Sequence, residues 1–200
     1  MASLYLIRHG EIDANVQQRW HGSTDSELNP NGVSQAARMG EYVNEKYPDI
    51  SIIYSSPLKR TLETADALSR VANTELVCHS GLREFGIGKL EDAPYLALLE
   101  DHRFFDAIEE NHNYRPSGGE SVNQVRDRML SAAQEIRDRH TGEHVALVSH
   151  GAAIAILLSH LFNGIPFPFS GYHMSNTGVT LINWDFEPKL ISFDETLHLA

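Results

Sequence analysis

Residues 3–10 read Ser-Leu-Tyr-Leu-Ile-Arg-His-Gly, an apolar run that ends in an arginine, a histidine and a glycine. A short apolar run bounded by such residues predicts a buried β-strand, here over residues 3–8. Residues 147–151 read Leu-Val-Ser-His-Gly and repeat the pattern at the end of a strand predicted over 144–149. Ligands of open α/β sheets bind beyond the carboxyl ends of the strands. His9 and His150 are therefore candidate site residues.

Strands and helices alternate along the rest of the chain. Asn29-Pro30 and Ser56-Pro57 each place a capping side chain before a proline, which is typical of a helix start. This alternation predicts an α/β fold, a three-layer α/β/α sandwich with a mainly parallel central sheet. The other predicted strands span residues 50–54, 75–78, 179–185 and 190–193, and the predicted helices span residues 30–43, 57–68, 122–136 and 152–162.

Residues 80–120 break the alternation, because they mix glycines, aromatic residues and acids, with one helix predicted near residues 94–110. We interpret this segment as a small cap or lid over the edge of the sheet, within a single domain that covers residues 1–200. Most of its aromatic side chains are expected to pack the cap onto the body of the domain, and one or two to line a pocket.

The composition argues against several classes of protein. The formal net charge is −11, which disfavours binding to nucleic acid or to an anionic membrane. No apolar stretch approaches the roughly 20 residues that span a bilayer, and Arg8 interrupts the first apolar run too early for a signal peptide. We therefore expect a cytoplasmic protein. Cys78 is the single cysteine, which rules out an internal disulfide, and we expect it to be a small core residue on a strand.

Two arginines and two glycines accompany the strand-end histidines. Arg8 adjoins His9, and Arg60 lies in the first turns of the second predicted helix. Arginine offers planar, bidentate donors to phosphate and stays charged, so these residues can gather locally the positive charge that the chain lacks globally. Gly10 and Gly151 allow a sharp turn and a close approach to a ligand. Gly151 also opens a helix, whose free N–H groups favour an anion.

These residues belong to a longer pattern. Arg8-His9-Gly10-Glu11, followed by Asn15, resembles the signature of the histidine phosphatase superfamily, which is also called phosphoglycerate mutase-like. The resemblance continues in order through nearly the whole chain. Its further blocks are Gly22 with Asp25, Leu28, Gly32 and Gln35-Ala36; Ser55 to Thr61 with Thr64-Ala65; Leu82-Arg83-Glu84 with Gly88; Gly118 to Ser121; and Ser149-His150-Gly151.

The resemblance implies a role for each matching residue. His9 would attack phosphorus and become a phosphohistidine, while Glu84 would protonate the leaving oxygen and later activate water. Arg8, Arg60 and a protonated His150 would hold the phosphoryl oxygens as part of the catalytic set. The residues implied around the substrate or its phosphate are Arg8, Asn15, His21, Gly22, Arg60, His150 and Gly151. This assignment suits phosphoryl transfer, which mainly needs positioning and neutralisation of charge.

Several positions bear on specificity or leave a role open. Ile12, His21 and Asp92 depart from the family pattern, which often has Thr or Ser, Gln or Ser, and Gly at these positions. His21 either contacts the substrate or is a residue of the rim. Glu91 is a rival to Glu84 as the acid, because both lie in the same loop. Asn176 resembles a family position near the site, with a minor role expected.

The favoured function is a metal-independent phosphatase that acts on small phosphate monoesters, with no cofactor. A phosphoglycerate-type mutase on the same site is the main alternative, although the mutases that the chain resembles are usually longer. A silent phospho-ligand binding module is a second alternative, and the intact catalytic set argues against it. A metallohydrolase is a third, but the histidines lack metal-ligand spacing. The sequence predicts neither the individual substrate nor the oligomeric state.

Overall fold

The computed structural model describes residues 3–100, 102–167 and 170–200. It contains a six-stranded sheet in the order β3-β2-β4-β1-β5-β6. The first four strands in this order run parallel, β5 pairs antiparallel with β1, and β6 pairs antiparallel with β5 at the edge of the sheet. The strands are β1 (Ser3–Arg8), β2 (Ile50–Ser55), β3 (Leu76–Cys78), β4 (His144–Ser149), β5 (Val179–Trp184) and β6 (Pro188–Glu195). The prediction of a mainly parallel sheet is confirmed.

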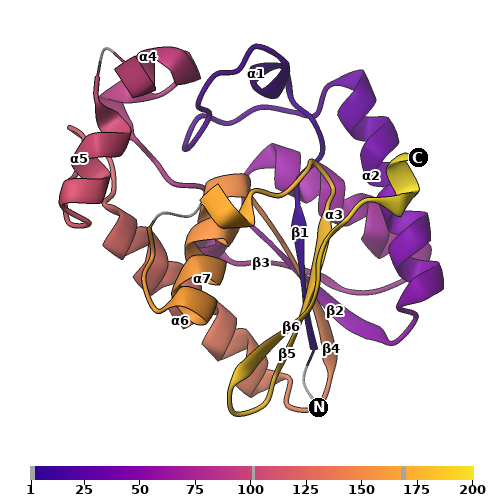
Figure 1. Ribbon diagram of the computed structural model, residues 1–200. Coiled ribbons are helices and arrows are strands. Elements are labelled where there is room, and N and C mark those ends of the chain that lie inside the picture. The colour runs from indigo at the N-terminus through magenta and orange to yellow at the C-terminus, as the bar shows by residue number, and fades with distance from the viewer. Residues whose placement is uncertain (1–2, 101, 168–169) are drawn as a thin grey trace.

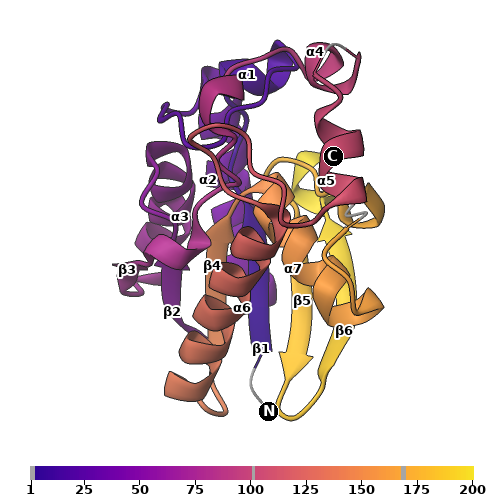
Figure 2. The same cartoon turned by 90° about the vertical axis from the view of Figure 1, so that its left-hand side faces the viewer.

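Helices cover both faces of this sheet, and the edge-on view in Figure 1 shows the three layers. The helices α2 (Pro30–Lys46) and α3 (Lys59–Ala72) pack on one face, and α6 (Val122–Arg139) and α7 (Gly151–Asn163) pack on the other. Figure 2 looks onto the second face, with α6 and α7 in front of the strands. The two apolar clusters that result hold β1 and β4 in the middle of the molecule. The predicted three-layer sandwich is confirmed.

Local capping explains where two of these helices begin. Asn29 accepts a hydrogen bond from the Gly32 backbone N–H at the start of α2, 2.8 Å from oxygen to nitrogen. Ser121 and Gln124 form the predicted capping box at the start of α6. Each interaction satisfies a backbone donor that the first helical turn leaves free.

The cap segment differs from its prediction. Two short helices, α4 (Tyr95–Glu100) and α5 (Phe104–Glu110), replace the single helix expected over residues 94–110, of which residue 101 lies outside the described residues. Arg103 adopts a positive φ of 46°, which a continuous α-helix does not allow. Both helices lie, with α1 (Asp13–Val16), toward the carboxyl end of β1 (Figure 1). The 3₁₀ turns are Ser80–Leu82, Gly88–Leu90, Ser170–Tyr172 and Leu197–Leu199.

Aromatic packing attaches the cap to the body. Trp20 makes edge-on ring contacts with Phe85 and Phe104, each with 5.8 Å between ring centroids. Cys78 does not fit its prediction, because it lies exposed at the end of β3, the short edge strand, rather than in the core. Among the described helices, none is long and apolar enough to cross a membrane.

Candidate active site

The parallel pairing of β1 with β4 brings the two strand-end histidines together. Arg8 pairs with Ser149 at the end of the register, so that His9 and His150 leave the sheet side by side. Their rings meet edge-on, with 5.2 Å between centroids. A cavity of about 690 Å³ opens at this end of the sheet. Its wall includes Arg8, His9, Asn15, His21, Glu84 and Gly151.

His9 is buried and held in one tautomer. Its Nδ1 lies 2.7 Å from the carbonyl oxygen of Gly10, which can only accept, so Nδ1 carries the proton and donates it. Burial lowers the pKa of His9 well below its ordinary value of 6.5, and the positive charges of Arg60 and Arg8 lower it further. The ring is therefore neutral, and its Nε2 lone pair is available as a nucleophile.

His150 is also neutral in the free site. Its Nδ1 accepts a hydrogen bond of 3.2 Å from Nε of Arg60, and its Nε2 therefore donates to the hydroxyl of Ser56 at 2.8 Å. Burial and then the Arg60 charge lower the pKa of His150 well below 6.5. A second proton on this ring would have to displace an arginine that already donates to it.

Arg60 lies beneath the site and holds one of its loops. Its two terminal nitrogens donate to the carbonyl oxygens of Thr24, His21 and Gly22 at 2.8, 3.0 and 2.8 Å. Neither Arg60 nor His150 is among the residues that line the cavity in the free site. Gly22 also lies behind the wall, where a Cβ atom would overlap the carbonyl oxygen of Phe85.

Arg8 faces the cavity with an unused donor. Its Nη1 donates to the carbonyl oxygen of Met174 at 2.6 Å, which fixes the guanidinium. Its Nε is buried and has no hydrogen-bond partner within the part of the chain that the structure describes. A buried donor without a partner costs free energy, so this nitrogen is suited to an anionic ligand in the cavity.

The N-terminus of α7 holds the Glu84 carboxylate. One oxygen accepts from the backbone N–H of Ala153 at 2.8 Å, and the other accepts from that of Ala152 at 3.2 Å. Two of the N–H groups that the start of α7 leaves free are thus used by a carboxylate of the protein itself. Gly151 still forms part of the cavity wall, and so does Glu84. A carboxyl group is thereby fixed at the side of the cavity.

Comparisons with known proteins agree with this geometry. The family model described as histidine phosphatase superfamily (branch 1) matches residues 4–192. The chain belongs to the histidine phosphatase superfamily. It is 34% identical over 168 residues to the uncharacterized phosphatase PhoE of Bacillus subtilis, covering 83% of this chain and 80% of PhoE. It is also 34% identical over 161 residues to phosphoglycerate mutase-like protein 4 of Arabidopsis thaliana, covering 78% and 69% of the two chains.

A solved structure of the superfamily is similar over its whole length. It is a phosphoserine phosphatase variant from Entamoeba histolytica in complex with phosphoserine, with a TM-score of 0.90 and 29% sequence identity. The alignment covers 100% of both chains. The α/β fold is therefore shared with a histidine phosphatase that binds a small phosphorylated molecule.

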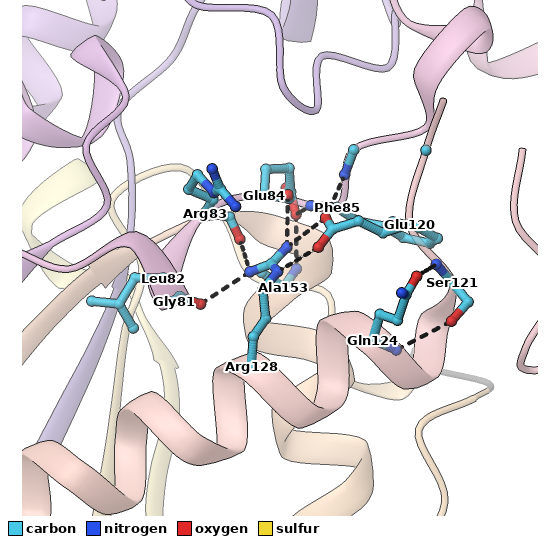
Figure 3. A network of polar contacts seen from close by, with 12 residues as sticks. Gly81, Leu82, Arg83, Glu84, Phe85, Glu120, Ser121, Gln124, Arg128 and Ala153 are labelled. Carbon is cyan, nitrogen blue, oxygen red and sulfur yellow. Dashed lines mark hydrogen bonds and ion pairs between the residues drawn. The ribbon is translucent and has the colours of Figure 1, made fainter. Parts of the chain in front are cut away.

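In this member of the histidine phosphatase superfamily, the loop that carries Glu84 is fixed by Arg128 of α6 (Figure 3). Arg128 donates to the carbonyl oxygens of Gly81, Arg83 and Glu84 at 3.0, 2.6 and 2.8 Å. It also forms two hydrogen bonds with the carboxylate of Glu120, at 2.8 and 2.9 Å. Sequence reasoning missed Arg128, because an arginine on a helix between apolar positions gives no signal of the loop that it contacts.

Two asparagines organise the opposite wall. The Asn15 side-chain oxygen accepts from the Ile12 backbone N–H at 3.1 Å and from Asn176 at 3.2 Å. Asn176 also donates to the His9 carbonyl oxygen at 2.9 Å. Because the oxygen of Asn15 is used in this way, its NH₂ group is left to donate toward the cavity. Asn176 thus has a larger part in building the site than the sequence suggested.

Glu91 has a different position from Glu84. Its carboxylate accepts from the backbone N–H groups of Gly22, Thr24 and Ile87, at 2.9, 3.4 and 2.8 Å. It ties two loops together and does not form part of the cavity wall. No group of three or more His, Cys, Asp or Glu side chains among the described residues is arranged to hold a metal ion.

Proposed function

We propose that this chain is a phosphatase that hydrolyses small phosphate monoesters through a phosphohistidine on His9. The observation that carries the proposal is the hydrogen bond from His9 Nδ1 to the Gly10 carbonyl oxygen, which leaves Nε2 as the only free nitrogen of a neutral ring. A nucleophile in this state can form the N–P bond as the P–O bond to the alcohol breaks. Hydrolysis of the N–P bond then releases phosphate and restores the neutral ring.

Cations and donors around His9 would neutralise the transferring group. Arg8 and the Asn15 amide face the cavity and would hold the phosphoryl oxygens directly. Arg60 would supply a permanent positive charge behind His9, close enough to lower the pKa of that histidine. His150 would offer its Nε2–H, which Ser56 accepts in the free site and a phosphoryl oxygen can accept instead. Positioning and charge of this kind support a metal-independent reaction.

Glu84 would act as the proton donor. An alkoxide is a poor leaving group, so the breaking P–O bond needs a proton in the transition state. The carboxyl group lies in the cavity wall, and backbone N–H groups of α7 prevent it from rotating away. After the alcohol has left, the same carboxylate would take a proton from the attacking water. Glu91 does not suit this role, because it lies behind the cavity wall and ties two loops together there.

The short cap favours hydrolysis over mutase chemistry. A mutase must keep water from its phosphohistidine, whereas a phosphatase must admit it. We propose that residues 80–120 act as a cap within one domain and that His21 contacts the substrate. We further propose that the substrate is a small phosphorylated metabolite and that the protein works in the cytoplasm.

The test replaces His9 with alanine and measures phosphate release over a panel of phosphorylated metabolites. His9→Ala should lose turnover on every substrate while keeping the unfolding transition of the wild type. His102→Ala is the matched control, because His102 is exposed on the cap. Rapid quenching of the wild type should trap a phosphoenzyme that is labile in acid and stable in base. Near-normal turnover by a folded His9→Ala protein would refute the assignment.

A further inference from the structure

Two departures from the family pattern, His21 and Asp92, contact each other in the structure. Nδ1 of His21 lies 2.7 Å from one carboxylate oxygen of Asp92. The side chain of His21 is 12% exposed and lines the cavity, whereas that of Asp92 is 45% exposed and lies behind it toward solvent. Because a carboxylate only accepts, Nδ1 carries a proton and donates it to Asp92.

The backbone holds Asp92 in place against a conformational cost. Asp92 has a φ of 61°, a left-handed conformation that glycine adopts freely and that disfavours residues with a side chain. Its backbone N–H donates to the Trp20 carbonyl oxygen at 2.8 Å, and its second carboxylate oxygen accepts from Thr24 at 3.1 Å. This position therefore carries a carboxylate where glycine would be less strained, and the carboxylate is directed at His21.

Within the described part of the chain, the other nitrogen of His21 is left without a partner, in a side chain that lines the cavity. Its Nε2 is buried and has no hydrogen-bond partner among the described residues. The His21 side chain belongs to the cavity wall, and a charge on it is close enough to influence His9. In a neutral ring this nitrogen would present a lone pair to a phosphate oxygen and repel it. In a protonated ring it would donate a charge-assisted hydrogen bond, with Asp92 balancing the new charge.

Charged groups of both signs surround this ring. Asp92 and Glu91 come from the loop that packs against residues 21–24, and Glu91 accepts from the backbone N–H of Gly22. Arg60 reaches the His21 carbonyl oxygen from α3, and His9 lies at the end of β1. A bound dianion adds two negative charges on the cavity side. These two negative charges favour the imidazolium form of His21 when the site is occupied. They are absent from the empty site.

We propose that His21, paired with Asp92, binds the phosphoryl group as an imidazolium, so that substrate binding takes up one proton. The inference rests on the proposed function, because it names a donor for the phosphate that the phosphatase would bind. It makes Asp92 a positioning residue and His21 a direct substrate contact. Both residues then determine how affinity depends on pH, while leaving the nucleophile and the acid unchanged.

Sulfate binding tests the proposal without turnover, since sulfate is a tetrahedral dianion with no titration of its own near neutral pH. Calorimetric titrations of the full chain at about pH 7.5, in buffers of different ionisation enthalpy, count the protons taken up on binding. The wild type should take up close to one proton. His21→Gln should lose most of this uptake and bind sulfate about tenfold more weakly at about pH 6.

Asp92→Gly should reduce the uptake in the wild-type background and have no further effect in a His21→Gln background. Undiminished uptake by His21→Gln would overturn the inference and leave the proposed phosphatase standing. Equal loss of affinity at acid and alkaline pH would also overturn it, because a neutral contact would then explain the residue. If the wild type binds no sulfate while remaining folded, both the inference and the proposed phosphate site fail.

Discussion

Replacement of Arg128 with methionine should loosen the loop that carries Glu84 while leaving the cavity wall itself unmutated. Arg128 makes three hydrogen bonds to loop carbonyl oxygens and two to Glu120. The side chains of Arg128 and Glu120 are only 16% and 28% exposed. Truncation therefore leaves a largely buried carboxylate without its cation and three carbonyl groups without a donor.

The expected loss of stability follows from this count. Removal of one partner from a buried ion pair costs about 3–5 kcal/mol. Since water can reach part of this pair, we expect the lower end, about 3 kcal/mol, which corresponds to a fall in Tm of about 6–12 °C for a chain of this length. Arg126→Met is the control on the same helix, because within the described part of the chain the hydrogen bonds of Arg126 go to the side chains of Asn123 and Asp127 and not to the loop of Glu84.

The catalytic effect should depend on the leaving group. An alkyl phosphate needs the proton from Glu84, whereas an activated aryl phosphate departs with little protonation. In Arg128→Met, single-turnover formation of the phosphoenzyme from the alkyl ester should slow about tenfold or more. This is a part of the roughly 10²–10⁴-fold acceleration that a general acid contributes. The aryl ester should be little affected. Glu84→Gln should show the same selectivity more strongly, and Glu91→Gln should not show it.

An equal slowing on both esters would refute this reasoning, because Arg128 would then support the site as a whole and not the acid. A selective loss in Glu91→Gln alone would show that the donor is Glu91 and that Glu84 had been assigned wrongly. Steady-state rates do not decide the matter, since Glu84 is also expected to assist water in the second step.

Two further predictions concern the solvent conditions. Activity should persist in strong chelators and be inhibited by vanadate, which adopts the five-coordinate shape of the transferring group; loss of activity in a chelator, restored by added metal, would contradict this. Stability should fall as the pH drops below about 6.5, because His9 and His150 have lowered pKa values in the folded chain and ordinary ones when unfolded. Below that pH, each buried histidine should change the free energy of unfolding, measured in urea, by up to about 1.4 kcal/mol per pH unit. The same pH dependence in His150→Gln as in the wild type would contradict this prediction for His150.

The sequence predicted the sheet and the paired histidines because both depend on local patterns. The apolar run before His9 and the one before His150 each determine a buried strand, and the parallel fold then brings their ends together. The hydrogen bond from Arg60 to His150 could not be predicted, since it joins residues that only the tertiary structure brings together. The contact of Glu84 with the N-terminus of α7 could not be predicted for the same reason.

Other errors have similar causes. The predicted helix over residues 94–110 divides where Arg103 adopts a left-handed conformation, which no glycine or proline announces at that point. Cys78 was expected in the core, yet β3 is a short strand at the edge of the sheet and leaves the thiol exposed. The contact of His21 with Asp92 joins two loops far apart in the sequence, so that each residue seemed an isolated departure.

The register of β1 with β4, which begins with Ser3 opposite His144, has a consequence for synthesis of the chain. The first strand leaves the ribosome long before its neighbour exists, and it waits as an unpaired apolar segment while β2 and the cap emerge. No nascent fragment that lacks β4 can place the two histidines together. The pair of histidines therefore forms only late in synthesis, and products that end before β4 should lack the proposed activity altogether.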